Sequence, residues 1–298
     1  MSELHLLPIP RVENLAADEF RRTYLEPNHP VIIKDLASSW PAAKKWTPQY
    51  FAREYGSLPV KVYNSSFARA GTSYMSSLRK IPFRGYLDLM MTSSMDLRLF
   101  AFNIFWQAPE LKQDLLWPDI TQGFSKKFIF MFFGCKGSVT PLHYDPDLPY
   151  LLHTVLYGKK RVVLFANEES KNLYKHPFNT RSYVDIDEPD FGKFPRLREA
   201  TGYQAIIHSG ETLFMPSGYW HQMIYEEAGY AVCTRCAKLP AARKLRAYVN
   251  LLVCFPIDKI MNKLSAESWF KWKEKRARRL SPGKTGDPIT TRATFRAR

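Results

Sequence analysis

Short apolar segments, separated by glycine and proline, dominate the middle of the chain. Each is seven to nine residues long, a length that suits strands better than helices. They are LRLFAFNIF (97–105), KFIFMFFG (127–134), LLHTVLYG (151–158), KRVVLFA (160–166), YQAIIHSG (203–210), ETLFMPSG (211–218) and YAVCTRC (230–236). Many short strands without helical patterns between them are typical of an antiparallel sandwich or barrel. We therefore predict a mainly β fold with a jelly-roll core, a double-stranded β-helix whose mouth holds a small ligand.

The first 96 residues combine helical and strand patterns. Helical spacing is found at 14–25, 46–56 and 84–92, and strand-like alternation at 29–36 and 58–66. Thr47-Pro48 and Gly56 are residue types that commonly begin and end a helix. We expect residues 1–96 to form an α+β region that packs on the jelly-roll core, which we place at 97–238.

Beyond Pro240 the pattern becomes helical. Three segments with helical spacing follow, at 241–255, 257–264 and 267–280. Pro256 is expected to separate the first two segments, because proline breaks a helix interior. We predict a C-terminal helical region at 239–280. The end of the chain, 281–298, is rich in proline, glycine, threonine and basic residues, so a flexible basic tail is predicted.

Positive charge is concentrated at the C-terminal end. The net charge of the chain is +15, and residues 239–298 contain 15 Lys and Arg against 4 Asp and Glu. A surface of this charge attracts RNA, anionic lipid or an acidic protein partner. A solvated helix face that keeps the protein soluble is the alternative, and composition alone does not decide between them. RNA bound through the basic C-terminal region therefore stays a candidate partner.

The sequence also bears on where the protein works. No run of 18 apolar residues is present, so no transmembrane segment is predicted. The N-terminus lacks the basic start and apolar stretch of a secretion signal. Four cysteines are too few for a disulfide framework and fit a reducing compartment. Cys233 and Cys236 form a lone CxxC in a strand-like segment, which is not expected to bind zinc or to carry redox chemistry. We expect a cytoplasmic protein.

A histidine and an aspartate at the end of an apolar run are the first sign of chemistry. His143 and Asp145 lie two residues apart in GSVTPLHYDPDLPY (137–150), and residues i and i+2 of a strand point to the same face. His221, 78 residues later, is the best third metal ligand. Two histidines and one carboxylate leave coordination positions open, as in the facial triad of non-haem Fe(II) oxygenases. The remaining histidines are expected to be structural or solvated; they are His5, His29, His153, His176 and His208.

The order of these motifs resembles the Jumonji C, cupin-like 2-oxoglutarate oxygenases. The matching pieces are APELKQDL (108–115), SVTPLHYD (138–145), YGKKRVVLF (157–165), YVDIDEPDFGKFP (183–195) and SGETLFMPSGYWH (209–221). The close resemblance runs from about Arg98 to Cys236. It is strongest to the protein-hydroxylase branch, such as the asparaginyl hydroxylases, and to the branch that hydroxylates wybutosine in tRNA. The histone-demethylase branch looks less similar.

The resemblance implies a set of site residues. Fe(II) would be held by His143, Asp145 and His221. The far carboxylate of the cosubstrate 2-oxoglutarate would pair with Lys160 and accept a hydrogen bond from Thr140. With dioxygen as the second cosubstrate, such an enzyme hydroxylates a C–H bond of its substrate.

The sequence also departs from the family pattern around the cosubstrate. A tyrosine common on the early strand corresponds to Phe100, which cannot donate a hydrogen bond, and Arg98 is the candidate substitute. The asparagine that usually follows the aspartate ligand is missing, and on the last strand Cys236 and Lys238 replace the usual Asn or Ser and Trp. The cosubstrate pocket is therefore expected to be rebuilt around an intact triad.

Several functions stay open at this point. Hydroxylation of a protein side chain is the leading interpretation, and the same chemistry on RNA or a small molecule is the second. A non-catalytic metal-binding module and a zinc hydrolase are the others. The C-terminal helices are expected either to pair two subunits as a homodimer or to cover an edge of the barrel.

Overall fold

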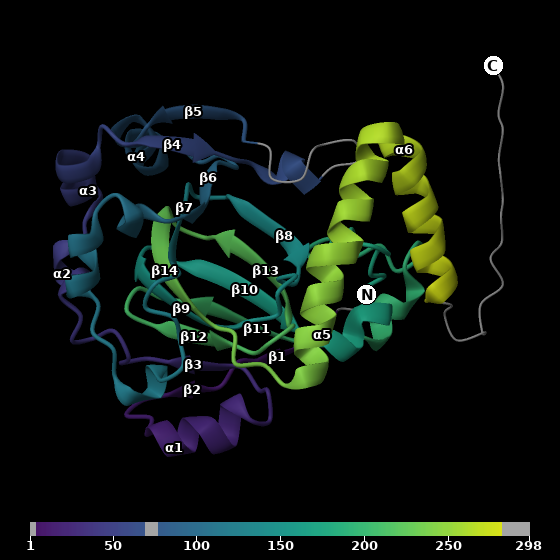
Figure 1. Ribbon diagram of the computed structural model, residues 1–298, viewed down its shortest axis with the longest axis horizontal. Coiled ribbons are helices and arrows are strands. Elements are labelled where there is room, and N and C mark those ends of the chain that lie inside the picture. Colours follow the sequence, from purple (N-terminus) through teal and green to yellow (C-terminus); the bar gives the residue numbers. More distant parts are fainter. Residues whose placement is uncertain (1–3, 69–76, 282–298) are drawn as a thin grey trace.

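Two β-sheets packed against each other form the core of the protein (Figure 1). The computed structural model describes residues 4–68 and 77–281. The five-stranded sheet has the order β1 (His5–Pro8), β11 (Thr201–Ile207), β10 (Lys160–Phe165), β13 (Trp220–Tyr225) and β8 (Val139–His143). The seven-stranded sheet has the order β2 (Arg11–Val12), β3 (Val31–Ile33), β12 (Thr212–Met215), β9 (Tyr150–Tyr157), β14 (Gly229–Cys236), β7 (Ile129–Gly134) and β6 (Arg98–Phe102). This arrangement confirms the predicted jelly-roll core.

The space between the sheets is filled at one part of the barrel and hollow at another. Val162 and Leu164 of β10 pack with Leu213 of β12 and Ala231 of β14, and all four are buried. Because side chains alternate along a strand, each strand contributes every second residue to this interior. Where polar side chains replace the apolar ones on β8, β10 and β13, the interior opens into a cavity.

The N-terminal region adds strands to both sheets and helices to one outer face. Its helices are α1 (Ala17–Phe20), which continues as the π-helical turn η1 (Arg21–Leu25), α2 (Pro41–Lys45), α3 (Pro48–Tyr55) and α4 (Phe83–Thr92). A hairpin of β4 (Pro59–Val62) and β5 (Arg79–Pro82) forms a separate small sheet. Thr47 caps α3 by accepting a hydrogen bond from the Tyr50 backbone N–H at 3.0 Å. Phe51 of α3, Phe83 of α4 and Phe133 of β7 pack together, which fixes these helices on the seven-stranded sheet.

Five helices and strands were not predicted: β1, β2, α2, β5 and β13. The first four have five residues or fewer, so none of them shows a full period of either pattern. Short 3₁₀ turns connect the larger elements; they are η2 (Ser65–Ala68), η3 (Ile104–Trp106), η4 (Pro109–Asp114), η5 (Asp119–Thr121), η6 (Asn167–Lys171) and η7 (Pro195–Glu199).

The C-terminal helices form a hairpin beside the open end of the barrel (Figure 1). The order is α5 (Ala241–Val249), the π-helical turn η8 (Asn250–Cys254) and α6 (Phe255–Leu280). The expected break at Pro256 is wrong, because the proline occupies the first turn of α6, where its missing N–H costs no hydrogen bond within that turn. The second predicted break is confirmed, since Ser265 has non-helical angles (φ −159°, ψ 70°) that kink α6.

Buried polar contacts hold the two arms of this hairpin together. Asp258 accepts hydrogen bonds from the Trp269 indole N–H at 2.7 Å and from Lys273 at 2.5 Å. The predicted basic tail, 281–298, lies from residue 282 onward outside the described residues. The boundaries 1–96, 97–238 and 239–280 stay a prediction. No helix among the described residues is long and apolar enough to cross a membrane.

Candidate metal centre and its cavity

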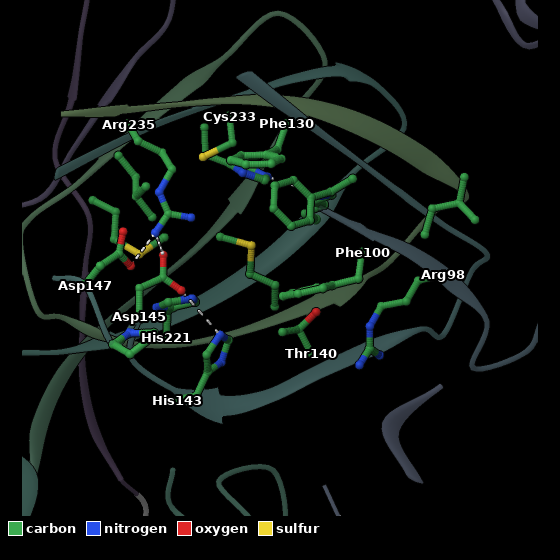
Figure 2. A pocket seen from close by; sticks show the side chains of 18 of the residues that line it. Arg98, Phe100, Phe130, Thr140, His143, Asp145, Asp147, His221, Cys233 and Arg235 are labelled. Carbon is green, nitrogen blue, oxygen red and sulfur yellow. Dashed lines mark hydrogen bonds and ion pairs between the residues drawn. The ribbon is translucent and has the colours of Figure 1, made fainter. Parts of the chain in front are cut away.

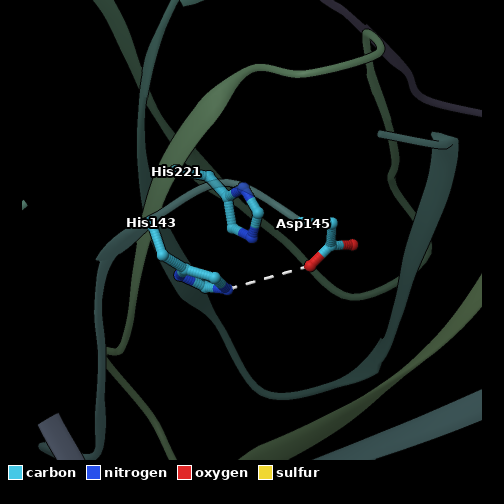
Figure 3. Close-up of side chains that lie close together, drawn as sticks. All are labelled: His143, Asp145 and His221. Carbon is cyan, nitrogen blue, oxygen red and sulfur yellow. Dashed lines mark ion pairs between the residues drawn. The ribbon is translucent and has the colours of Figure 1, made fainter. Parts of the chain in front are cut away.

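Three potential metal ligands meet at one end of the barrel (Figure 3). His143 is the last residue of β8, and His221, on β13, is its direct partner across the antiparallel pair. Asp145 follows two residues after His143. We expected it on the strand itself, but β8 ends at His143 and Asp145 lies in the segment beyond. One ligand atom from each of the three residues lies within 4.8 Å of the others, so the chain brings together the predicted triad.

Backbone carbonyls fix which nitrogen of each histidine faces the centre. Nδ1 of His143 lies 2.8 Å from the Pro141 carbonyl oxygen, and Nδ1 of His221 lies 3.2 Å from that of Tyr219. A carbonyl only accepts, so each Nδ1 carries the proton and each Nε2 presents a lone pair. Burial lowers the pKa of His143 to about 3 and also lowers that of His221. Both rings are therefore neutral, which is the form that binds a metal ion.

The aspartate is held by an arginine. Arg235 of β14 donates to Oδ2 of Asp145 at 3.0 Å and to Oδ1 of Asp147 at 2.7 Å (Figure 2). Oδ1 of Asp145 lies 3.9 Å from His143 Nε2 and has no such partner among the described residues. Burial alone would raise the pKa of Asp145, but Arg235 and the histidines lower it on balance, so the carboxylate stays ionised. Two imidazole nitrogens and one carboxylate oxygen form a donor set that suits Fe(II).

A cavity of about 330 Å³ leads from the triad into the barrel. At its far end lies Lys160, the first residue of β10, which is 1% exposed. Its Nζ lies 3.2 Å from Nε2 of His153 and 4.2 Å from the ring centre of Tyr225. Thr140 of β8 also lines the cavity, between Lys160 and the metal end in the fold. Burial lowers the pKa of Lys160 to about 7. The cavity thus has a metal-binding end and a cationic end.

Arg98 and Phe100 line the same cavity from β6 (Figure 2). Arg98 is 2% exposed and donates to the Val139 carbonyl, and its Nη1 lies 3.4 Å from Oδ1 of Asp96. Burial lowers its pKa to about 10, so it remains charged. Its charge is thus partly matched by protein groups, in contrast to that of Lys160, which has no acidic partner among the described residues.

The C-terminal helices take part in the site. Phe255, at the start of α6, lines the cavity. The side chain of Asn250 donates to the Pro146 carbonyl at 3.0 Å and so fixes the loop that carries Asp145. This loop lacks the asparagine that usually follows the aspartate ligand, and no pattern in the sequence predicted that one would approach from the helical region.

Three site residues were missed. His153 was expected to be structural or solvated; it is buried, lines the cavity and contacts Lys160. The sequence signal for His153 was its place as a polar residue in a mostly apolar strand, on the same face as Leu151. Tyr225 follows His221 and Met223 at every second position of β13, and all three line the cavity. Arg235 was not assigned to the site, because no motif or spacing indicates that its side chain reaches Asp145.

Comparison with known proteins identifies the family. Residues 16–250 match the model described as Cupin-like domain, which covers more than half of the chain. The chain therefore belongs to this cupin-like family, whose JmjC members use Fe(II) and 2-oxoglutarate.

Individual relatives support the same assignment. Lysine-specific demethylase 8 of Xenopus tropicalis is 29% identical over 235 residues, which cover 75% of this chain and 52% of that protein. JmjC domain-containing protein D of Dictyostelium discoideum is 31% identical over 237 residues, covering 68% and 50%. The tRNA wybutosine-synthesizing protein 5 of Homo sapiens is 27% identical over 257 residues, covering 79% of each. The chain spans about half the length of the first two relatives.

These matches correct one expectation. Proteins named as lysine-specific demethylases were expected to be less similar than the wybutosine branch, but they match at equal or higher identity. The resemblance to the wybutosine branch is confirmed. It had been judged mainly on the motifs between Arg98 and Cys236, whereas the family match also covers most of the N-terminal region.

Proposed function

We propose that this protein is an Fe(II)- and 2-oxoglutarate-dependent dioxygenase that hydroxylates a C–H bond of a protein side chain. The observation that carries the proposal is one cavity with the triad of His143, Asp145 and His221 at one end and the buried cation of Lys160 at the other. A dicarboxylate with a chelating keto acid at one end and a second carboxylate at the other matches that polarity.

Each residue has a distinct task in this proposal. Bound iron supplies the oxidising chemistry that a side chain lacks. His143 and His221 present their Nε2 lone pairs, and Asp145 presents Oδ1, while Arg235 retains Oδ2. Lys160 and Thr140 bind the far carboxylate of 2-oxoglutarate, and the apolar walls of the cavity limit the entry of water.

A direct experiment tests this activity. The protein is incubated with Fe(II), 2-oxoglutarate and air, and succinate is measured with and without candidate substrate. We expect slow uncoupled turnover that His143→Ala abolishes and that His208→Ala, at an exposed histidine outside the cavity, leaves unchanged. Absence of both turnover and iron binding in the wild-type protein would contradict the proposal and favour a non-catalytic module.

A groove beside the triad supports a polypeptide substrate. A hollow of about 610 Å³ adjoins the cavity and shares Phe130, Asp147 and Arg235 with it. Asp145 and Asp147 form ion pairs with Arg235. Lys238, the other basic residue of this lining, has no ion pair in the described part of the chain. Such a lining suits an extended peptide, whose side chain would enter toward the triad, better than a phosphate backbone.

RNA is the second candidate substrate, and a specific surface favours it. On the second arm of α6, Lys271, Lys275, Arg278 and Arg279 surround a shallow hollow with Glu274. One relative is named as a tRNA wybutosine-synthesizing protein, whereas others are named as lysine-specific demethylases, which suggests protein as well as RNA substrates.

One comparison separates the two substrate classes. Cell-extract proteins and total tRNA are each treated with the enzyme, and mass spectrometry searches for the added mass of one oxygen atom. We expect the gain on a protein. A gain on tRNA that is lost in Lys275→Glu/Arg279→Glu, with unchanged uncoupled turnover, would assign the RNA substrate instead.

The predicted homodimer has a matching surface on the first helical arm. Large apolar side chains there are more than half exposed; they are Leu245, Tyr248, Leu252, Ile260 and Leu264. We propose that a second copy of the chain covers them. Light scattering should show a dimer that Leu252→Asp dissociates and that Leu78→Asp, on the N-terminal region, does not.

The cytoplasmic location also stays a prediction; all four cysteines are free thiols.

A further inference from the structure

The cationic end of the cavity contains a second donor that the proposed function has not used. Tyr225 is the last residue of β13 and is 3% exposed. It pairs directly with Lys160 across the antiparallel ladder, so both side chains leave the same face of the sheet. Lys160 Nζ lies 4.2 Å from the centre of the tyrosine ring.

The hydroxyl of Tyr225 is available for a ligand. No hydrogen bond of this hydroxyl is found among the described residues, although a buried tyrosine hydroxyl usually makes one; the tyrosine lines the cavity, within electrostatic reach of Arg98. Burial raises the pKa of Tyr225 well above its ordinary value, so the hydroxyl stays protonated and can donate. Lys160 likewise has no acidic partner in the described part of the chain. A buried ammonium group over the ring of a tyrosine whose hydroxyl has no partner forms a site that lacks an anion.

The position of the ring is built into the fold. Backbone hydrogen bonds fix Tyr225 on both sides, from its N–H to the Ser138 carbonyl at 3.0 Å and from the Gly137 N–H to its own carbonyl at 2.8 Å. The ring itself lies on the α-carbon of Gly134 in β7. A β-carbon at that glycine would lie 2.4 Å from Cε2 of the tyrosine. Only glycine leaves the space that this ring occupies.

The other candidates for this role are less suitable. Phe100, on β6, faces the cavity but has no group that can donate. Arg98 already donates to the Val139 carbonyl and lies beside Asp96, so its charge is partly matched.

We infer that Tyr225 binds the far carboxylate of 2-oxoglutarate, donating a hydrogen bond to it beside Lys160 and Thr140. This inference rests on the proposed function, because it assigns a residue to the cosubstrate of that same site. It replaces Arg98 with Tyr225 as the residue that compensates for Phe100, and it makes Gly134 the position that allows this exchange.

The test measures binding rather than turnover. Calorimetry with the Mn(II)-loaded protein compares wild type with Tyr225→Phe, which removes the hydroxyl and keeps the ring on Gly134. We expect about tenfold weaker binding of 2-oxoglutarate, the usual effect of losing one hydrogen bond to a charged group. Tyr157→Phe is the matched control, because Tyr157 stacks on Tyr230 and does not line the cavity.

A second ligand separates recognition from a structural effect. In 2-oxopentanoate a methyl group stands in place of the far carboxylate. Its affinity, measured by competition, should be the same for wild type and Tyr225→Phe. An equal loss for both ligands would mean that the hydroxyl only supports the fold, and no loss for either would also overturn the inference. Failure of wild type itself to bind 2-oxoglutarate would instead contradict the proposed function.

Discussion

The two ends of the cavity are built in different ways. At the metal end, two of the three ligands lie two residues apart in sequence, and the third is paired with His143 on the neighbouring strand. Each histidine is oriented by a carbonyl two residues before it. At the other end, which we propose binds the cosubstrate and call the cosubstrate end, the proposed donors come singly from three strands, with Thr140 on β8, Lys160 on β10 and Tyr225 on β13. Packing, rather than a local motif, sets their positions.

This difference has a physical consequence for substitution. A metal ion needs its ligands within a narrow range of distance and direction, so few residue types can serve and their spacing is constrained. A carboxylate accepts hydrogen bonds from many directions, so a donor can move from one strand to another if space is made for it. Gly134 makes that space for Tyr225.

The largest effect should follow from a change at the metal end. His143→Ala removes one of three ligands and leaves the other two without the geometry of a facial triad. We expect at least about 100-fold weaker binding of Mn(II), since loss of an outer partner alone commonly costs 10–100-fold. Equilibrium dialysis measures this loss, and His208→Ala is the control. An unchanged affinity would show that the triad is not the metal site.

The metal end is also the part that the sequence predicted best. The strand pattern indicated the jelly roll, and HxD with a distant histidine indicated the triad, because both signals are local or strictly spaced. His153, Tyr225 and Arg235 gave no such signal. Their roles depend on which side chains face each other across β9, β10, β13 and β14, and therefore on strand register. Asn250 was even harder to predict, because it contacts Pro146 of the Asp145 loop through the packing of the C-terminal helices.

At the cosubstrate end, the charge of Lys160 should matter most. Lys160→Met keeps most of the side-chain length and removes the cation. We expect about 100-fold weaker binding of 2-oxoglutarate and unchanged Mn(II) affinity, because a charge-assisted contact is lost and the triad is untouched. The neighbouring Lys159→Met is the matched control, as Lys159 is partly exposed and pairs with Glu227. If both variants bind equally well, Lys160 has no role in recognition.

Lys160→Met should stabilise the folded protein although it weakens the binding of 2-oxoglutarate. Burial lowers the pKa of Lys160 from 10.5 to about 7. The unfolded chain therefore binds more protons than the folded one between these pH values, and the wild type gains stability as pH rises, by up to about 1.4 kcal/mol per pH unit. Lys160→Met lacks this pH-dependent gain in stability. Its free energy of unfolding, from urea titrations, should exceed that of wild type at pH 7, and the excess should shrink by pH 9. A constant difference would mean that burial does not lower the pKa of Lys160.

The smallest effect concerns Arg235, which holds the metal end from outside the ligand set. Arg235→Met frees Oδ2 of Asp145 and removes a partner of Asp147. We expect about tenfold weaker Mn(II) binding, as is usual when a group that orients a ligand is lost. Asp147→Asn keeps the bond from Arg235 to Asp145 and should change the affinity less. If Arg235→Met instead strengthens Mn(II) binding, the arginine competes with the metal for Asp145, and the metal end would then depend on packing from a distant strand as much as the cosubstrate end does.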